Sequence, residues 1–243
     1  MKNLLIYTNA AKEFNEENKT LVKIHIDNSL RLGWNRDDIL LYTNFPYEYN
    51  GVKAIEVDDS LDLIWDRSSN KIFVIQHLLE RKELPDDLYW YHDFDAYENE
   101  AIVEDELDID NFAVTGYGYK DQVNGGSFFF RLSAKPIFDL WCKRTRAVKR
   151  TRADEKSMTD MTRDGSLKNY KMLDITYNFG QRCPNLCYKY AQKPIKVLHF
   201  HPYYRYYESK EENINIFMYG KNLQKKPMMS KGLIEIFQKH GIK

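Results

Sequence analysis

Residues 88–95 read Leu-Tyr-Trp-Tyr-His-Asp-Phe-Asp, and this stretch decides which fold the sequence predicts. From Leu88 to His92 the side chains are apolar or aromatic without alternation, which is typical of a strand buried on both faces of a parallel sheet. The chain then turns acidic at Asp93 and Asp95. In an extended segment residues two apart point the same way, so we expect both carboxylates to face one point beyond the strand.

The segments on either side alternate between strand and helix patterns. We expect strands at 4–7, 39–42, 52–57, 112–115, 127–132 and 197–200. Apolar residues at helical spacing predict one helix that Gly33 stops, a second that carries Ile72 and Leu79, and others at 136–149 and 233–239. This alternation predicts an α/β fold with a mixed, mainly parallel sheet flanked by helices, in which ligands bind beyond the carboxyl ends of the strands.

Composition narrows the class of protein. The 243 residues are 43% hydrophobic and 30% charged, which excludes a disordered chain, and no repeat or linker divides them, so one domain is expected. Basic and acidic residues balance at 36 each, so we expect no nucleic-acid partner. Cys142, Cys183 and Cys187 cannot all pair, and the apolar start of the chain is too short for a signal peptide or membrane span. A cytoplasmic protein with free thiols is expected.

The pair Asp93 and Asp95 is a candidate metal site. Carboxylate oxygens suit Mg²⁺ or Mn²⁺, which keep the rest of their coordination for water and substrate phosphates. An Asp-x-Asp sequence also occurs in solvated turns, and we interpret the acidic run at 104–110 as a solvated face. The position of Asp93 and Asp95 directly after a buried strand favours metal binding.

Further polar features follow in order along the chain. Asn124-Gly125-Gly126 precedes an aromatic strand, where paired glycines allow close approach of a ligand or simply form a hairpin or bulge. Asp154-Glu155 opens a segment able to start a helix, His199 ends a late strand, and Arg205 follows it.

In this order the features resemble glycosyltransferases of the GT-A fold, in particular their retaining, glycogenin-like and bacterial galactosyltransferase-like branch. The late motif of that branch is His-Phe-x-Gly-x-x-Lys, and here His199-Phe200 is followed by Pro202 in place of the glycine and Arg205 in place of the lysine. The chain is also similar to the small glycosyltransferases that large algal DNA viruses encode, which would place it in the host cytoplasm.

The resemblance implies a role for each matching residue. It implies that Asp93, Asp95 and His199 hold Mn²⁺ or Mg²⁺, and that Asp154 or Glu155, where the family has Asp-Gln, faces the reacting carbon. It implies that the nucleotide-sugar contacts Thr8, Asn9, Arg67, Asp93, Asn124, Gly125, Gly126 and Arg205, with Arg67 reaching the diphosphate or holding Asp93. Within a single domain over 1–243, residues 1–100 would bind the nucleotide and 101–210 the sugar and acceptor, followed by a helix near 230–240.

The implied reaction is transfer of a hexose from a nucleotide-sugar, UDP-glucose by family habit, to a hydroxyl of a glycan or glycoprotein, with retention of configuration. Two alternatives stay open: a metal-dependent phosphoesterase, which predicts a second metal site, and a degenerate transferase that only binds nucleotide-sugar or glycan. An inverting enzyme would use Asp154 or Glu155 as general base.

Several neighbouring side chains have competing interpretations. His201 is a satisfied histidine or an alternative metal ligand, and His92 should point to the opposite face of its strand from Asp93. The tyrosines around Arg205 pack a loop or stack on sugars. A run of basic residues is a solvated helix face or touches an anionic acceptor or membrane headgroups. The run consists of Lys143, Arg144, Arg146, Lys149, Arg150 and Arg152.

Overall fold

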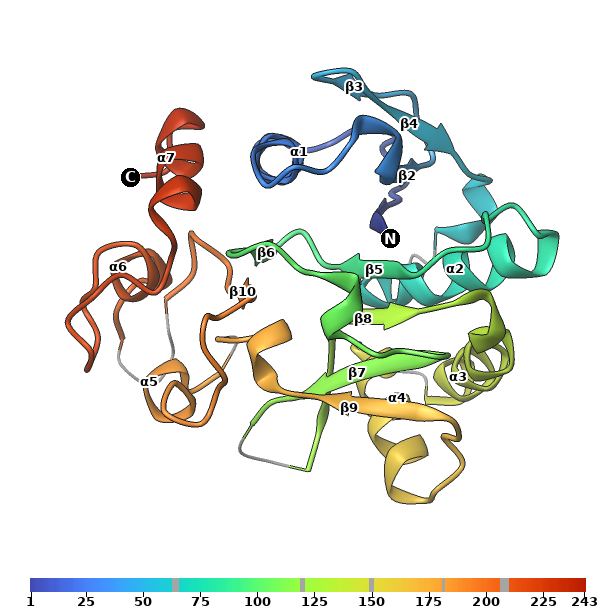
Figure 1. Ribbon diagram of the computed structural model, residues 1–243. Coiled ribbons are helices and arrows are strands. Elements are labelled where there is room, and N and C mark those ends of the chain that lie inside the picture. Colours follow the sequence, from blue (N-terminus) through green and yellow to red (C-terminus); the bar gives the residue numbers. More distant parts are fainter. Residues whose placement is uncertain (63–65, 119–120, 149–150, 181, 206–209) are drawn as a thin grey trace.

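A computed structural model describes residues 1–62, 66–118, 121–148, 151–180, 182–205 and 210–243. Its centre is an eight-stranded sheet with the strand order β3-β4-β2-β1-β5-β8-β7-β9, and β6 and β10 form a separate two-stranded sheet (Figure 1).

The first half of the chain builds the parallel part of the sheet. Its elements are β1 (Lys2–Tyr7), α1 (Glu16–Arg31), β2 (Ile39–Thr43), β3 (Glu48–Tyr49), β4 (Val52–Glu56), α2 (Asn70–Arg81) and β5 (Tyr89–His92). Strand β1 pairs in parallel with β2 and β5, and β2 pairs in parallel with β4. Strands β1, β2, β4 and β5 therefore end at the same edge of the sheet. The Asn15 side chain caps α1 by accepting a hydrogen bond from the amide of Asn18.

The second half adds antiparallel strands and the remaining helices. These are β6 (Ala96–Glu98), β7 (Phe112–Gly116), β8 (Val123–Phe130), α3 (Lys135–Val148), α4 (Ala153–Arg163), β9 (Tyr170–Leu173), α5 (Pro184–Cys187), β10 (Val197–His199), α6 (Asn213–Phe217) and α7 (Lys231–Lys239). Strand β8 lies antiparallel between β5 and β7, whereas β9 is parallel to β7. Strand β10 pairs antiparallel with β6, so His199 lies opposite Ala96, just after the acidic pair.

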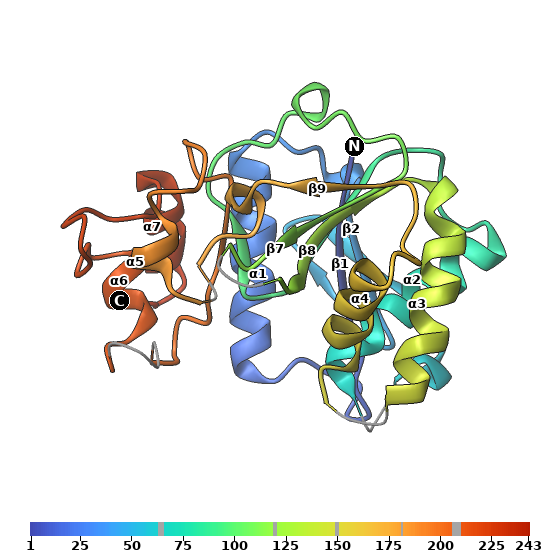
Figure 2. The ribbon, with the colours of Figure 1, turned by 90° about the horizontal axis from the view of Figure 1, so that it is seen from below.

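Helices cover both faces of the sheet (Figure 2). On one face, α2, α3 and α4 pack on Leu4, Ile6 and Phe128. On the other, α1 packs on Leu5 and Leu41 in a cluster that continues through β10 into α6 and α7. Across the described residues, every helix falls short of the length and apolarity that a bilayer crossing requires.

The predicted fold class, a mixed and mainly parallel sheet flanked by helices, is confirmed. Element bounds differ in places. The strand expected at 127–132 begins at Val123 and ends at Phe130, so Asn124, Gly125 and Gly126 lie inside it rather than before it. Its pairing with β7 jumps from Val114–Phe128 to Thr115–Asn124, so the bulge that the glycines also suggested is present.

Candidate active site

Residues 93–95 form a turn between β5 and β6. The amide of Asp93 donates to the carbonyl of Gly126 at 2.8 Å, and the amide of Phe200 donates to the carbonyl of Asp95 at 2.8 Å. The expectation of an extended segment is therefore wrong, because the chain reverses toward β6 immediately after His92. The turn is tied to β8 on one side and to the end of β10 on the other, and this brings the two carboxylates together.

Asp93, Asp95 and His199 form a cluster of candidate metal ligands, each offering one atom within 4.8 Å of the others. The imidazole of His199 is buried, and its Nδ1 lies 2.8 Å from Oδ1 of Asn178, which fits Nδ1–H donating to that oxygen. A second contact, to Nδ2 of Asn124, is longer at 3.5 Å.

This tautomer leaves the lone pair of His199 Nε2 facing the Asp95 carboxylate, 3.2 Å away, with no hydrogen-bond partner among the described residues. A lone pair and a carboxylate that face each other need a proton or a cation between them. Burial lowers the pKa of His199, but the Asp95 carboxylate more than offsets this and holds the pKa above its ordinary value. The three residues therefore fit a hard divalent cation such as Mn²⁺ or Mg²⁺.

The two glycines of β8 have different neighbours. A Cβ on Gly126 would lie 2.1 Å from Cε1 of His199, so the ring occupies the space that any other residue would fill. A Cβ on Gly125 would lie 3.5 Å from Oδ2 of Asp154 and 3.6 Å from Cγ of Glu155. Gly126 thus seats the histidine, and Gly125 leaves open the space above the acidic pair of α4.

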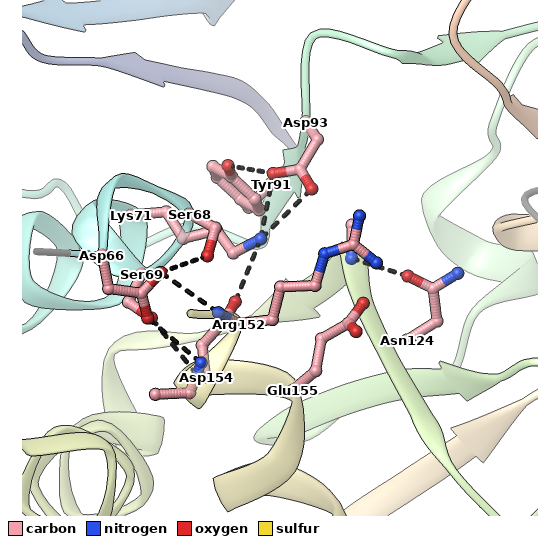
Figure 3. Close-up of polar contacts among 12 residues, drawn as sticks. Asp66, Ser68, Ser69, Lys71, Tyr91, Asp93, Asn124, Arg152, Asp154 and Glu155 are labelled. Atoms are coloured by element: carbon pink, nitrogen blue, oxygen red, sulfur yellow. Dashed lines mark hydrogen bonds and ion pairs between the residues drawn. The ribbon is translucent and has the colours of Figure 1, made fainter. Parts of the chain in front are cut away.

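Lys71 is one of the residues that the sequence analysis missed. Its ammonium is buried and lies 3.0 and 3.1 Å from the two carboxylate oxygens of Asp93 and 3.2 Å from Oδ2 of Asp154 (Figure 3). Burial disfavours the charged amine, yet Asp93 and Asp154 raise the pKa of Lys71 above its ordinary value. Tyr91 also donates to Asp93, at 2.6 Å. Lys71 and Tyr91 therefore hold Asp93, a task that the sequence analysis gave to Arg67 as one of two possibilities.

Helix α4 is anchored so that Asp154 and Glu155 reach β8. The amides of Arg152 and Ala153 donate to the Asp66 carboxylate at 3.2 and 3.0 Å, and the amide of Asp154 donates to Oγ of Ser69 at 3.2 Å (Figure 3). These carboxylate and hydroxyl groups satisfy the free amides of the helix N-terminus. The predicted start of a helix at Asp154-Glu155 is thus confirmed, one residue earlier.

The two acids of α4 differ in environment. Asp154 is fully buried, and burial raises its pKa to about 6 although Lys71 acts in the opposite direction. Glu155 is half-buried and accepts a hydrogen bond of 2.7 Å from the hydroxyl of Tyr117.

A cavity of about 230 Å³ adjoins the cluster at the carboxyl ends of β1 and β5. Its lining includes Thr8, Asn9, Arg67, Lys71 and Asp93. The hydroxyl of Thr8 accepts from Asn70 at 2.8 Å, and Nδ2 of Asn9 donates to Tyr7 and to the carbonyl of Glu13. The structure therefore gathers Thr8, Asn9, Arg67 and Asp93, four of the predicted nucleotide contacts, around one cavity.

The remaining sequence candidates lie apart from this cavity. Arg205 is exposed, and its backbone forms an isolated bridge with Glu212, so its role at a diphosphate stays a prediction. His201 pairs with Glu17 at 2.5 Å through Nε2 and its ring stacks on Tyr204, whereas its buried Nδ1 has no hydrogen-bond partner among the described residues. It lies outside the group of three candidate ligands. Tyr206 and Tyr207, like Lys149 and Arg150, lie outside the described residues.

Two other expectations are confirmed. His92 points away from the cluster: its Nε2 lies 2.8 Å from Oδ1 of Asn3 and its ring stacks on Trp90. The three cysteines are buried, and none of them forms a disulfide within the described residues.

Comparison with protein-family models and with curated proteins found no match. Among solved structures, a glycosyltransferase involved in the glycosylation of the major capsid of PBCV-1 superposes with a TM-score of 0.53 and 13% identity, over 82% of this chain and 93% of its own. Galactosyltransferase LgtC, solved with donor and acceptor sugar analogs, gives a TM-score of 0.54 and 11% identity over 84% of this chain and 90% of its own. Mouse xyloside xylosyltransferase 1 gives a TM-score of 0.51 and 14% identity over 82% of this chain and 97% of its own.

The chain has the GT-A fold of these glycosyltransferases. The fold that the sequence predicts is thereby confirmed. At identities of 11–14% the likeness extends to the fold alone, and the roles of individual residues rest on the contacts described above.

Proposed function

We propose that this protein is a metal-dependent glycosyltransferase that moves a hexose from a nucleotide-sugar, UDP-glucose as first choice, to a hydroxyl of a glycan or glycoprotein acceptor. The observation that carries the proposal is the Asp93–Asp95–His199 cluster, whose Asp93 also lines the cavity formed by Thr8, Asn9 and Arg67. Its place at the strand ends of a GT-A fold is where a nucleotide and its diphosphate are expected. A glycosyltransferase involved in the glycosylation of the major capsid of PBCV-1 shares the fold, which is in keeping with a glycoprotein acceptor.

The chemistry required is neutralisation of the diphosphate that leaves. When bound by Asp93, Asp95 and His199, a divalent cation supplies Lewis-acid stabilisation of that leaving group. Asn178 sets the imidazole of His199 with Nε2 available, and Lys71 and Tyr91 fix the orientation of the Asp93 carboxylate. Arg67, at the edge of the cavity, offers a fixed positive charge to a phosphate.

Retention of configuration is the stereochemical outcome that we propose. An inverting enzyme needs a general base beside the acceptor hydroxyl. The Asp154 carboxylate is buried and ion-paired with Lys71, and Glu155 already accepts a hydrogen bond from Tyr117. Both acids are better placed to stabilise positive charge near the anomeric carbon than to take a proton from the acceptor.

The test is a product assay with a panel of radiolabelled UDP-sugars, with Mn²⁺ and with chelator. We expect release of UDP from one sugar, abolished by chelator and by Asp95→Ala, and an α-configured product by proton NMR when the α-linked donor is used. A β-configured first product would refute retention of configuration but not glycosyl transfer. Metal-independent turnover would contradict the metal site.

The rival readings predict different results in the same assay. A phosphoesterase needs a second metal site, whereas the Asp93–Asp95–His199 group is the one ligand cluster found within the described residues. Hydrolysis of simple phosphodiesters without sugar transfer would favour a phosphoesterase. A degenerate transferase would bind UDP-sugar but release no UDP with any acceptor.

A further inference from the structure

A second cavity, of about 410 Å³, has Glu155 in its wall. It is lined by four cationic side chains and two carboxylates among its polar residues: Arg152, Lys156, Arg163, Arg182, Glu155 and Asp160. A cavity with an excess of cations is suited to a ligand that carries negative charge.

Most of these cations already have partners. Lys156 pairs with Asp160 at 2.5 Å, Arg163 pairs with Asp121 at 3.2 Å, and the guanidinium of Arg182 lies over the Tyr117 ring at 4.7 Å. The guanidinium of Arg152 makes no hydrogen bond or ion pair with any residue that the structure describes. It is therefore the cation with its donors available to a ligand.

The backbone holds Arg152 in place beside the cavity. Its φ of 55° lies in the left-handed region, which is sparsely populated for residues other than glycine, and its amide is fixed by Asp66. From this position the side chain extends alongside Glu155 toward the strand that carries Asn124 (Figure 3). Burial and Glu155 raise the pKa of Tyr117, and Arg182 and Arg152 act against them, so both guanidinium groups lie within electrostatic reach of Tyr117.

The cavity also meets the proposed reaction centre. Glu155 lines it, and the Cγ atom of Glu155 lies 3.6 Å from the Cβ position of Gly125, where Oδ2 of Asp154 and Nζ of Lys71 are 3.5 and 3.9 Å away. The nucleotide cavity, lined by Thr8 and Asn9, also has Lys71 in its wall. One wall residue of each cavity, Lys71 of the first and Glu155 of the second, therefore lies within 4 Å of the Gly125 Cβ position.

We propose that this second cavity receives the acceptor, and that Arg152 selects acceptors that carry an anionic group, a carboxylate, sulfate or phosphate, on the sugar. That the ligand is the acceptor rests on the proposed glycosyl transfer. The planar fork of a guanidinium matches the paired oxygens of such groups and gives charge-assisted hydrogen bonds.

The experiment is calorimetric titration of methyl glucuronide, and of the 6-sulfate and 6-phosphate of methyl glucoside, into the protein saturated with UDP and Mn²⁺. Neutral methyl glucoside is the reference ligand. We expect at least one anionic sugar to bind about tenfold or more tightly than the neutral one. Arg152→Gln should remove that preference, and Arg152→Lys should keep part of it because the charge remains. Arg144→Gln, which removes a cation on α3 that pairs with Asp164, is the matched control.

Each outcome decides the inference. Equal binding of neutral and anionic sugars, or a preference that survives Arg152→Gln in a variant with unchanged thermal midpoint, would overturn it. A loss of UDP affinity in Arg152→Gln as large as the loss of sugar affinity would also overturn it, because the anion would then be the diphosphate of the donor. Absence of UDP binding in the unmodified protein would instead count against the proposed function.

Discussion

Replacing Lys71 with methionine removes a buried positive charge from between two carboxylates. The ammonium lies 3.0 Å from Asp93 and 3.2 Å from Asp154, and its side chain is only 6% exposed. Methionine fills a similar volume without the charge. Breaking a buried ion pair on one side leaves the other charge without compensation and costs about 3–5 kcal/mol of the free energy of unfolding.

The loss should depend on pH through Asp154. Burial raises the pKa of this group from 3.8 to about 6 even with Lys71 beside it, so removal of the ammonium raises it further. A carboxyl whose folded-state pKa exceeds its unfolded value favours folding most at low pH, and that advantage is lost as pH rises through the folded pKa. Each unit of pKa corresponds to about 1.4 kcal/mol. The deficit of Lys71→Met should therefore be larger at pH 8 than at pH 5.

Urea unfolding followed by circular dichroism at both pH values measures this deficit. The double variant Lys71→Met with Asp154→Asn removes the stranded carboxylate and should recover about half of the lost free energy at pH 8. A deficit below about 1 kcal/mol, equal deficits at the two pH values, or no recovery in the double variant would refute the view that Lys71 compensates Asp154.

Three further predictions concern the metal cluster. Gly126→Ala puts a methyl group 2.1 Å from Cε1 of His199, so Mn²⁺ affinity should fall by about tenfold or more. In Gly125→Ala the new methyl group meets nothing closer than 3.5 Å, so this variant should keep its Mn²⁺ affinity but bind UDP-sugar more weakly. Equal Mn²⁺ affinities of the two variants in calorimetry would contradict this prediction. Asn178→Ala removes the acceptor for Nδ1–H and should weaken Mn²⁺ by about 10–100-fold, and an unchanged affinity in a manganese EPR titration would exclude that role. Asp95 raises the pKa of His199, and a ligating imidazole must be neutral, so Mn²⁺ affinity should fall as pH drops through that pKa and Mn²⁺ binding should release a proton. Calorimetry in two buffers of different ionisation enthalpy measures the number of protons released. A proton count of zero near neutral pH would argue against His199 as a ligand.

The sequence was informative where chemistry coincides with a strand end. The position of Asp93 and Asp95 directly after a buried strand made them candidates, and the family resemblance added His199. The antiparallel pairing of β10 with β6 brings His199 to the two aspartates. The three side chains do lie together, although a turn rather than an extended segment unites Asp93 and Asp95, and metal binding by them stays a prediction.

The supporting residues were not predictable in this way. Lys71 stands next to Ile72 in the first turn of α2 and reads as one more solvated lysine of a helix. Its burial depends on Asp93 and Asp154, which are far away in sequence and meet it only in the folded protein. Asn178 likewise follows a short 3₁₀ turn, and no local pattern indicates that its side chain meets His199.

The strands that the sequence analysis did not find are those with the weakest patterns. Strands β3 and β6 are only two and three residues long, and β9 lies at the edge of the sheet with two exposed residues among four, so none of them shows a continuous apolar run. Their pairing is set by tertiary contacts rather than by local preference.

The most direct test of the central claim is calorimetric titration of UDP-glucose and other UDP-sugars into the protein, with Mn²⁺ and with chelator, repeated on Asp95→Ala. Asp105→Ala, which removes an exposed acid of the 104–110 run, is the matched control. We predict that one UDP-sugar binds only with metal, that Asp95→Ala abolishes this binding, and that Asp105→Ala leaves it unchanged. Absence of binding under every metal condition, or binding that chelator and Asp95→Ala leave intact, would contradict a metal-dependent glycosyltransferase site.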